Sequence, residues 1–171
     1  MLLSSTFASA YTNPVISHDF PDPAIVRLHD GTFAAFATNG GSSHIQCATS
    51  PDLVTWTTQP DALPALPAWA GSGRSCAPDV QLHGDTYFMY FLAYKSGTHT
   101  NCIGVATSKV ATGPYTPEDD APIVCDGDGH TAMDARSYDH SDGSVWLYFG
   151  SHHNPISTLT NPIPTENQTK Y

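Results

Sequence analysis

Three aspartates recur at nearly equal intervals along the chain, and each begins a short strand-like run. Asp22, Asp79 and Asp134 are 57 and 55 residues apart. Carboxylates gathered in one pocket shift one another's pKa values, which suits proton transfer or the binding of a cation. Inverting hydrolysis of a glycosidic bond needs one carboxylate to activate water and one protonated acid to release the leaving group. The alternative is that these aspartates cap turns or bind a structural ion.

The sequence around each aspartate repeats as well. An acid, a short strand, a turn and an aromatic-rich strand follow in that order, and the turns read His-Asp-Gly, His-Gly-Asp and Ser-Asp-Gly. These turns are typical of β-hairpins. A further strand between the aspartates ends at Ser50 and again at Ser108, 58 residues later. Each unit therefore contains two hairpins, and four strands at a period of about 56 residues are typical of a β-propeller blade.

Propeller geometry predicts where the aspartates lie. The first strand of each blade lines the central channel, so one position on successive first strands faces one axis. We therefore expect Asp22, Asp79 and Asp134 to converge at one end of the channel. Pro21 and Pro23 restrict the backbone around Asp22 and hold its carboxylate in place. A repeated β-sandwich is the competing fold, but it does not explain why an acid recurs at one strand position.

Composition narrows the classes of partner. The 171 residues include six Lys and Arg against sixteen Asp and Glu, a net charge of −10. This balance argues against a nucleic acid as partner, because phosphate backbones require clustered basic residues. No apolar stretch approaches the roughly 18 residues of a membrane span. Fourteen prolines and thirteen glycines favour strands and turns over helices.

The N-terminus and the cysteines predict a secreted chain. Residues 1–10 end in the small-x-small pattern of a signal-peptide cleavage site, and a frayed N-terminus is the alternative. The four cysteines show no CxxC spacing, so no zinc site is predicted. In a secreted chain the favoured disulfide joins Cys102 to Cys125.

Four segments, in order, carry a resemblance to a known family. They read SHDFPDPAIV, RSCAPDV, CIGVATSKVATGPY and HTAMDARSYDHSDGSVWLYFGS. Together they resemble glycoside hydrolase family 43, which contains five-bladed propeller arabinanases, α-L-arabinofuranosidases and β-xylosidases. The likeness covers Asn13 to about Gly150. It implies an all-β fold, with a partial propeller domain over residues 13–150.

The resemblance implies a role for each aspartate. Asp22 of FPDP matches the general base, which takes a proton from the attacking water. Asp134 of AMDARSY matches the aspartate that orients the general acid and raises its pKa. Asp79 of APDV belongs to a motif whose acid is mostly a rim or structural residue, and it ranks third as a substrate-binding candidate. Cys76 replaces the tryptophan usual in that motif, so a sugar-stacking surface is expected to be missing.

Two aromatic residues are candidates for stacking on a sugar. Phe20 stands two residues before Asp22, and Trp69 lies in a Pro-rich loop before Asp79. Packing inside the protein is the alternative for both. The resemblance implies a monomer that binds an arabinose- or xylose-containing oligosaccharide or polysaccharide and needs no cofactor or metal. The alternative is an ion in the channel beside one of the histidines His18, His44, His130, His152 and His153.

The family's general acid is a glutamate on a later blade. Both glutamates of this chain lie elsewhere: Glu118 precedes Asp134, and Glu166 stands in a segment without a strand pattern. At about 56 residues per blade, five blades need roughly 280 residues. We therefore expect about two and a half four-stranded antiparallel blades and a loop-like, truncated tail over residues 151–171.

The expected function is secreted hydrolysis of plant arabinan or xylan with inversion, weak in this chain because the general acid is absent. One alternative is a degenerate, catalytically inactive propeller remnant that binds sugar. Another is a scaffold propeller that binds protein.

Overall fold

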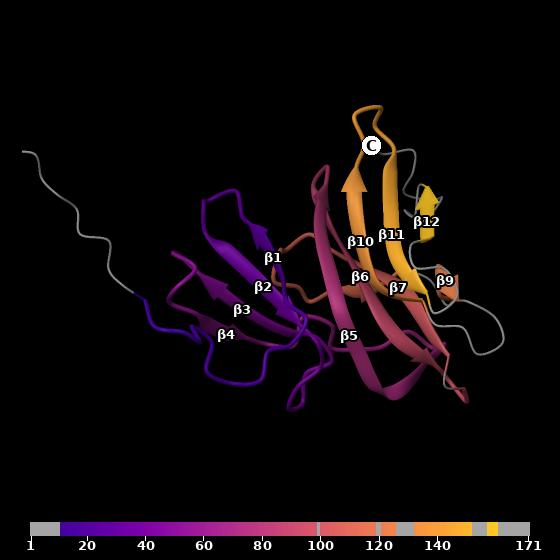
Figure 1. Ribbon diagram of the computed structural model, residues 1–171, viewed down its shortest axis with the longest axis horizontal. Coiled ribbons are helices and arrows are strands. Elements are labelled where there is room, and N and C mark those ends of the chain that lie inside the picture. Colours follow the sequence, from indigo (N-terminus) through magenta and orange to yellow (C-terminus); the bar gives the residue numbers. More distant parts are fainter. Residues whose placement is uncertain (1–10, 99, 119–120, 126–131, 152–156, 161–171) are drawn as a thin grey trace, which may run out of the picture.

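The computed structural model describes residues 11–98, 100–118, 121–125, 132–151 and 157–160 (Figure 1). Its regular elements are β-strands arranged in three antiparallel sheets, as the all-β prediction requires. Within the residues described, no helix is long and apolar enough to cross a membrane.

The first sheet has four strands in sequence order: β1 (Ala24–Arg27), β2 (Phe33–Ala37), β3 (Gln46–Ser50) and β4 (Thr57–Gln59). The turn after β1 is closed by Asp30, whose carboxylate accepts hydrogen bonds from the Thr32 backbone and hydroxyl at 2.9 and 2.6 Å. This Asx-type turn is the hairpin signal that the sequence contains.

The second sheet is larger and central. Its path runs β5 (Ala70–His83), β6 (Thr86–Lys95), β7 (Asn101–Ser108) and β8 (Thr116–Pro117), and the short β9 (Val124–Cys125) also pairs with β7. β3 and β7 end at Ser50 and Ser108, so both predicted strand ends are confirmed.

The third sheet contains β10 (Ala132–Asp139), β11 (Val145–Ser151) and β12 (Ser157–Thr160) in that order. β12 corrects the prediction that residues 151–171 are loop-like, because residues 157–160 pair with β11. The β-branched threonines at 158 and 160 favour a strand there. The predicted signal segment, residues 1–10, lies outside the described residues.

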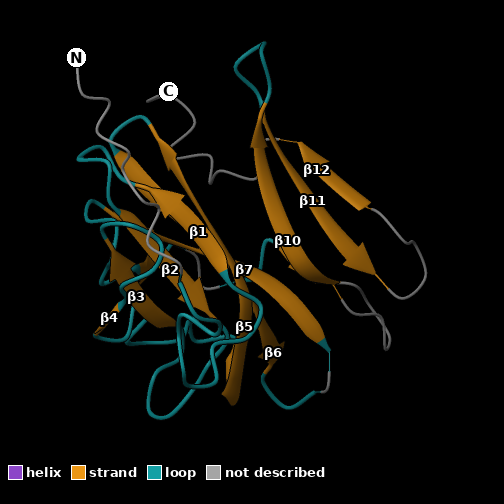
Figure 2. Cartoon of the chain, turned by 60° about the vertical axis from the view of Figure 1, so that its left-hand side comes forward, coloured by secondary structure: helices purple, strands orange, loops and turns teal. Residues whose placement is uncertain are grey.

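The central sheet is covered on both faces. Alternate residues of β6 point in opposite directions, so Tyr87, Met89 and Phe91 pack toward the first sheet, while Phe88 and Tyr90 pack toward the third. This two-sided burial explains why β6 is apolar along nearly its whole length. Figure 2 shows the first and third sheets on either side of the central one.

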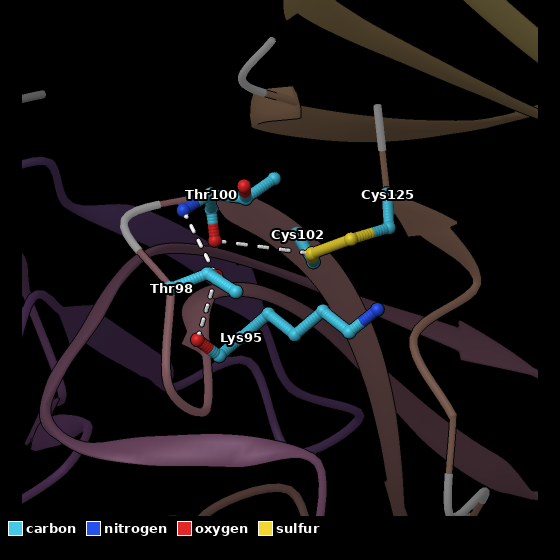
Figure 3. The surroundings of a disulfide bond; sticks show 5 residues. All are labelled: Lys95, Thr98, Thr100, Cys102 and Cys125. Atoms are coloured by element: carbon cyan, nitrogen blue, oxygen red, sulfur yellow. Dashed lines mark hydrogen bonds between the residues drawn. A yellow bond between two sulfur atoms is a disulfide. The ribbon is translucent and has the colours of Figure 1, made fainter. Parts of the chain in front are cut away.

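The predicted disulfide is confirmed. Cys102 of β7 and Cys125 of β9 are directly opposed in the strand pairing and are joined through their sulfur atoms (Figure 3). The bridge fastens β9 to the central sheet. Cys47 and Cys76 are buried free thiols. Burial raises the pKa of Cys47 to about 12, which keeps that thiol protonated and unreactive at neutral pH.

A buried histidine joins the central sheet to the third. His83 Nδ1 lies 2.9 Å from Asp139 Oδ1, and the His83 side chain is only 5% exposed. Burial lowers the pKa of His83, and the nearby charges of Asp139 and Asp79 oppose that shift without cancelling it. His83 is therefore mainly neutral in the folded protein near neutral pH.

We predict that the double substitution Cys102→Ser and Cys125→Ser destabilises the fold. A bridge across a sequence separation of 23 residues restricts the unfolded chain, and its removal is expected to cost about 3 kcal/mol. Denaturant unfolding measures the change. A reductant should destabilise the wild type by a similar amount and leave the double variant unaffected; a wild type insensitive to full reduction contradicts the prediction.

We predict that His83 makes the fold less stable in mild acid. Its pKa is lower folded than unfolded, so the folded state binds fewer protons. Its contribution to stability is complete above the unfolded pKa of about 6.5, and acidification below that value removes it. The loss is at most about 1.4 kcal/mol per pH unit. Unfolding free energies at pH 7.5 and 5.5 should differ more for the wild type than for His83→Gln, and equal differences contradict the prediction.

Candidate active site

The same backbone irregularity recurs just before the first strand of the first sheet and within the first strand of the other two. Two residues face one across the strand pair, as in a β-bulge, and the first of them has a left-handed backbone. These first residues are Asp22, Ala77 and Asp134, with φ of 53°, 47° and 54°. The pairing shifts between Cys76 and Asp79 and between Met133 and Arg136 mark the two later bulges.

The bulges correct one of the sequence predictions. Asp79 does not share the position of Asp22 and Asp134, because Ala77 occupies it in the central sheet. Asp79 stands two residues further along, inside β5. The repeat thus presents two carboxylates at equivalent positions, before β1 and on β10, and a methyl group between them on β5. β5 contacts both β1 and β10, so the central sheet lies against both strands that the aspartates precede or belong to.

Thr38, at the end of β2, connects Asp22 to the central sheet. The Thr38 hydroxyl donates a hydrogen bond to Asp22 Oδ2 at 2.7 Å and accepts one from the Ala77 backbone N–H at 3.0 Å. The one proton of the hydroxyl is thereby committed to the carboxylate. The sequence offered no signal for this residue, because its role depends on the packing of two sheets.

The pKa of the Cys76 thiol responds to both equivalent aspartates. Burial raises its pKa, the Arg74 guanidinium opposes that rise, and the negative charges of Asp22 and Asp134 both add to it. Both carboxylates are therefore close enough to act on one thiol. Asp22 and Asp134 are themselves exposed, so water and a ligand can reach them.

Asp79 links the central sheet to the third. Its side chain is buried, and its Oδ2 accepts hydrogen bonds from both the backbone N–H and the hydroxyl of Ser137, each at 2.7 Å. Its Oδ1 lies 3.2 Å from Arg136 Nη1. These contacts give the buried carboxylate a structural role between sheets in place of the substrate contact predicted from sequence.

Trp69 is also a packing residue, which corrects its prediction as a sugar-stacking surface. The residue is only 9% exposed. Its ring stacks on Phe91 with centroids 6.4 Å apart and planes 12° apart. A Cβ atom at Gly104 would come within 2.8 Å of both rings, so the glycine makes room for this stack. The apolar loop around Trp69 turns into the core instead of covering the rim.

Phe20 has a different setting. It is half-buried, and its ring meets His18 edge-on at 5.8 Å. It lines an open groove of about 510 Å³ together with His18, Asp19, Gly40, Gln46 and Gln59. An aromatic ring beside amide side chains suits a sugar, and the sugar contact of Phe20 stays a prediction.

Arg74 was not singled out by the sequence, although it precedes Cys76 by two residues. Its Nε donates to Cys76 Sγ at 3.3 Å, and its Nη1 donates to Tyr94 Oη at 2.8 Å. The guanidinium carbon also lies 5.2 Å from the centre of the Tyr94 ring, within the range of a cation–π contact. An exposed cation is thus held against the Cys76 thiol, whose pKa the charges of Asp22 and Asp134 raise.

Glu118 is not brought to the aspartates. It follows β8, at the opposite edge of the central sheet from β5, and accepts a hydrogen bond from the Thr107 hydroxyl. Glu166 lies outside the described residues. Within the described part, no group of three or more His, Cys, Asp or Glu side chains could hold a metal ion. His130, His152 and His153 also fall outside that part.

Comparison with known proteins identifies the family. The family model described as "Glycosyl hydrolases family 43" matches residues 11–168. The chain belongs to this family.

One curated relative of this family 43 chain is named for arabinan, and another is named for α-(1->5)-L-arabinofuranosyl bonds. A probable arabinan endo-1,5-alpha-L-arabinosidase A of Aspergillus flavus is 31% identical, covering 94% of this chain and 51% of the relative. An extracellular exo-alpha-(1->5)-L-arabinofuranosidase, ArbA, of Cellvibrio japonicus is 30% identical over 78% of this chain and 41% of its own length. The chain therefore spans about half the length of these relatives.

A solved family member has the same fold. The alpha-L-arabinanase of Cellvibrio cellulosa, in complex with arabinohexaose, superposes with a TM-score of 0.69 at 26% identity. The match covers 84% of this chain and 48% of the solved one. The resemblance found in the sequence is thus confirmed at the level of family and all-β architecture.

We predict that Asp79 of this family 43 chain matters for stability. Asp79→Ala leaves the Ser137 N–H and Arg136 without their buried partner and is expected to cost about 3 kcal/mol. Asp134→Asn is the control, because it changes an exposed carboxylate and an asparagine tolerates the left-handed backbone. Thermal and denaturant unfolding distinguish the two; an Asp79→Ala variant as stable as the control contradicts the linking role.

Proposed function

We propose that the chain belongs to an enzyme that hydrolyses α-L-arabinofuranosyl bonds of arabinan with inversion. The observation that carries the proposal is the equivalent placement of Asp22 and Asp134 at left-handed bulge positions, with both charges acting on the Cys76 thiol. Two exposed carboxylates held by the backbone of separate strands have the character of a reaction centre rather than of turn caps. Family membership supplies the class of reaction.

Asp22 is the proposed general base. Thr38 fixes its Oδ2 through the 2.7 Å hydrogen bond, which leaves Oδ1 to accept a proton from the attacking water. An inverting reaction places the general acid about 6.5–9.5 Å away across the sugar. Asp134 is the proposed residue that orients this acid and raises its pKa, a role that suits a carboxylate beside the base but on a different sheet.

Arabinan is the favoured substrate class. Both curated relatives above are named for arabinose linkages, and the solved relative is described with arabinohexaose. The groove beside Phe20 is large enough for a sugar unit. Xylan remains the second candidate within the family, and Phe20 is the proposed aromatic contact in either case.

We also infer that each sheet is one blade of a five-bladed propeller. The first sheet has four strands in order, the central sheet repeats that order, and each begins with the bulged strand. The third sheet repeats the bulge and the first three strands. Three blades of one ring would direct Asp22 and Asp134 toward the same axis.

Sugar binding without efficient catalysis is the second candidate function. It is favoured by the position of Glu118 at the far edge of the central sheet, away from β5. In that case the aspartates and the groove beside Phe20 bind the saccharide, while the general acid is not supplied by a described residue.

Secretion is the proposed location. The Cys102–Cys125 disulfide suits an oxidising compartment, and one relative is named extracellular. The chain is proposed to act as a monomer on a soluble or polymeric saccharide, without nucleic acid or membrane as partner.

We predict that the chain hydrolyses an aryl α-L-arabinofuranoside faster than linear α-1,5-arabino-oligosaccharides. An aryl leaving group needs little protonation, so water activation by Asp22 suffices. Asp22→Asn should lower the aryl rate about 10²–10⁴-fold, whereas Asp85→Asn, in the exposed β5–β6 turn, should not change it. The assay follows release of the aryl group.

Three outcomes separate the possibilities. An Asp22→Asn rate equal to wild type rejects the base assignment. Binding of arabino-oligosaccharides without turnover of either substrate supports the second candidate function. Preference for an aryl β-D-xyloside moves the substrate class from arabinan to xylan.

A further inference from the structure

Arg74 is an exposed cation whose direction is fixed. Its Nε is held by Cys76 Sγ and its Nη1 by the Tyr94 hydroxyl, at 3.3 and 2.8 Å. The guanidinium also lies over the Tyr94 ring. Two hydrogen bonds and a ring contact restrain this exposed side chain. Less side-chain conformational entropy is then lost when Arg74 binds a ligand.

The position of Arg74 relative to the aspartates follows from short contacts. Arg74 touches the Cys76 thiol, and the next residue, Ala77, donates its N–H to the Thr38 hydroxyl that holds Asp22. The Cys76 thiol is also within reach of the Asp22 and Asp134 charges. The guanidinium therefore stands at the edge of the same reaction centre.

Arg74 has donors left over. A guanidinium carries five N–H groups, and two are used by Cys76 and Tyr94. The remaining three make no hydrogen bond to the part of the chain that the structure describes, and Arg74 forms no ion pair there. Arg74 is exposed, so these N–H groups meet water in the free protein and are available to an acceptor on a ligand, such as a sugar hydroxyl or a carboxylate.

The surrounding charge selects between these acceptors. An anionic ligand would be repelled by Asp22 and Asp134, whereas the hydroxyl oxygens of a neutral sugar would not. We propose that Arg74, held by Tyr94 and Cys76, donates hydrogen bonds to the hydroxyl groups of a neutral arabinofuranosyl unit bound beside Asp22 and Asp134. This inference rests on the proposed function and names a substrate-binding residue for it.

The proposal also accounts for Cys76. A small thiol at this position leaves space that a large ring would fill, and the thiol gives Arg74 Nε an acceptor. Directed hydrogen bonds would then replace ring stacking at this edge of the site. Binding should consequently depend on the pattern of sugar hydroxyls more than on the apolar face of the sugar.

Calorimetric titration with linear α-1,5-arabinotriose tests the proposal. Arg74→Ala should weaken binding about 10-fold or more, because hydrogen bonds from a charged donor are lost. Arg74→Lys should recover only part of the affinity, since an ammonium cannot reproduce the planar donor set. Arg27→Ala is the matched control at the far end of β1 and should bind like wild type. Thermal unfolding of each variant verifies that it is folded.

Each result has a defined meaning. Wild type that binds arabinotriose, with Arg74→Ala binding equally well, overturns the role of Arg74 and leaves the proposed function intact. Wild type that binds neither arabinotriose nor xylotriose overturns both. A trigalacturonate probe tests the opposite choice of acceptor: tighter binding of this acidic trisaccharide than of arabinotriose, lost in Arg74→Ala, overturns the assignment to a neutral sugar.

Discussion

One hydroxyl group joins the proposed base to the boundary between two sheets. Thr38 donates to Asp22 and accepts from Ala77, so the direction of the Asp22 carboxylate depends on how the first sheet packs against the central one. That packing is apolar, with Phe36 and Phe91 fully buried in the shared core. The reactive geometry is therefore a product of sheet packing, and the local sequence FPDP alone does not determine it.

The boundary with the third sheet is held differently. There, polar contacts accompany the apolar core: Asp79 binds Ser137 and Arg136, and His83 meets Asp139. Buried hydrogen bonds are directional, so they fix how far β10 slides along β5. Asp134 lies on β10 and Asp22 precedes β1, so the distance between them depends on two interfaces. One is the apolar packing of the first sheet on the central sheet, and the other is the partly polar packing of the third sheet on the central sheet. The central sheet is thus the common reference for both carboxylates.

Features with local causes were predictable from sequence. The hairpin turns and the strand ends at Ser50 and Ser108 follow from turn residues and spacing. The disulfide favoured from the sequence, Cys102–Cys125, is also present. Features set by register and packing were not. Because Asp79 is also an aspartate near the start of a repeat, the sequence suggested that it is equivalent to Asp22 and Asp134. The strand pairing instead places Ala77 at the equivalent bulge position of β5.

The contacts made by Trp69 and Thr38 could not be predicted from the sequence either. Trp69 is buried because Gly104, thirty-five positions later, leaves space for its ring. Thr38 acquires its function only when the backbone of β5 reaches its hydroxyl. Both depend on contacts between segments distant in sequence, which a single sequence does not reveal.

The left-handed backbone at Asp22 and Asp134 has an evolutionary consequence. Few side chains tolerate this conformation, and asparagine, together with aspartate, is among the best suited. A single-base change in a codon converts aspartate to asparagine, removing the acid while preserving the fold and most of the hydrogen-bonding surface. Under the proposed function, such a change would remove hydrolysis in one step while the fold is kept, and the reverse change would restore the carboxylate. The left-handed backbone thus leaves aspartate and asparagine interchangeable for the fold at both positions.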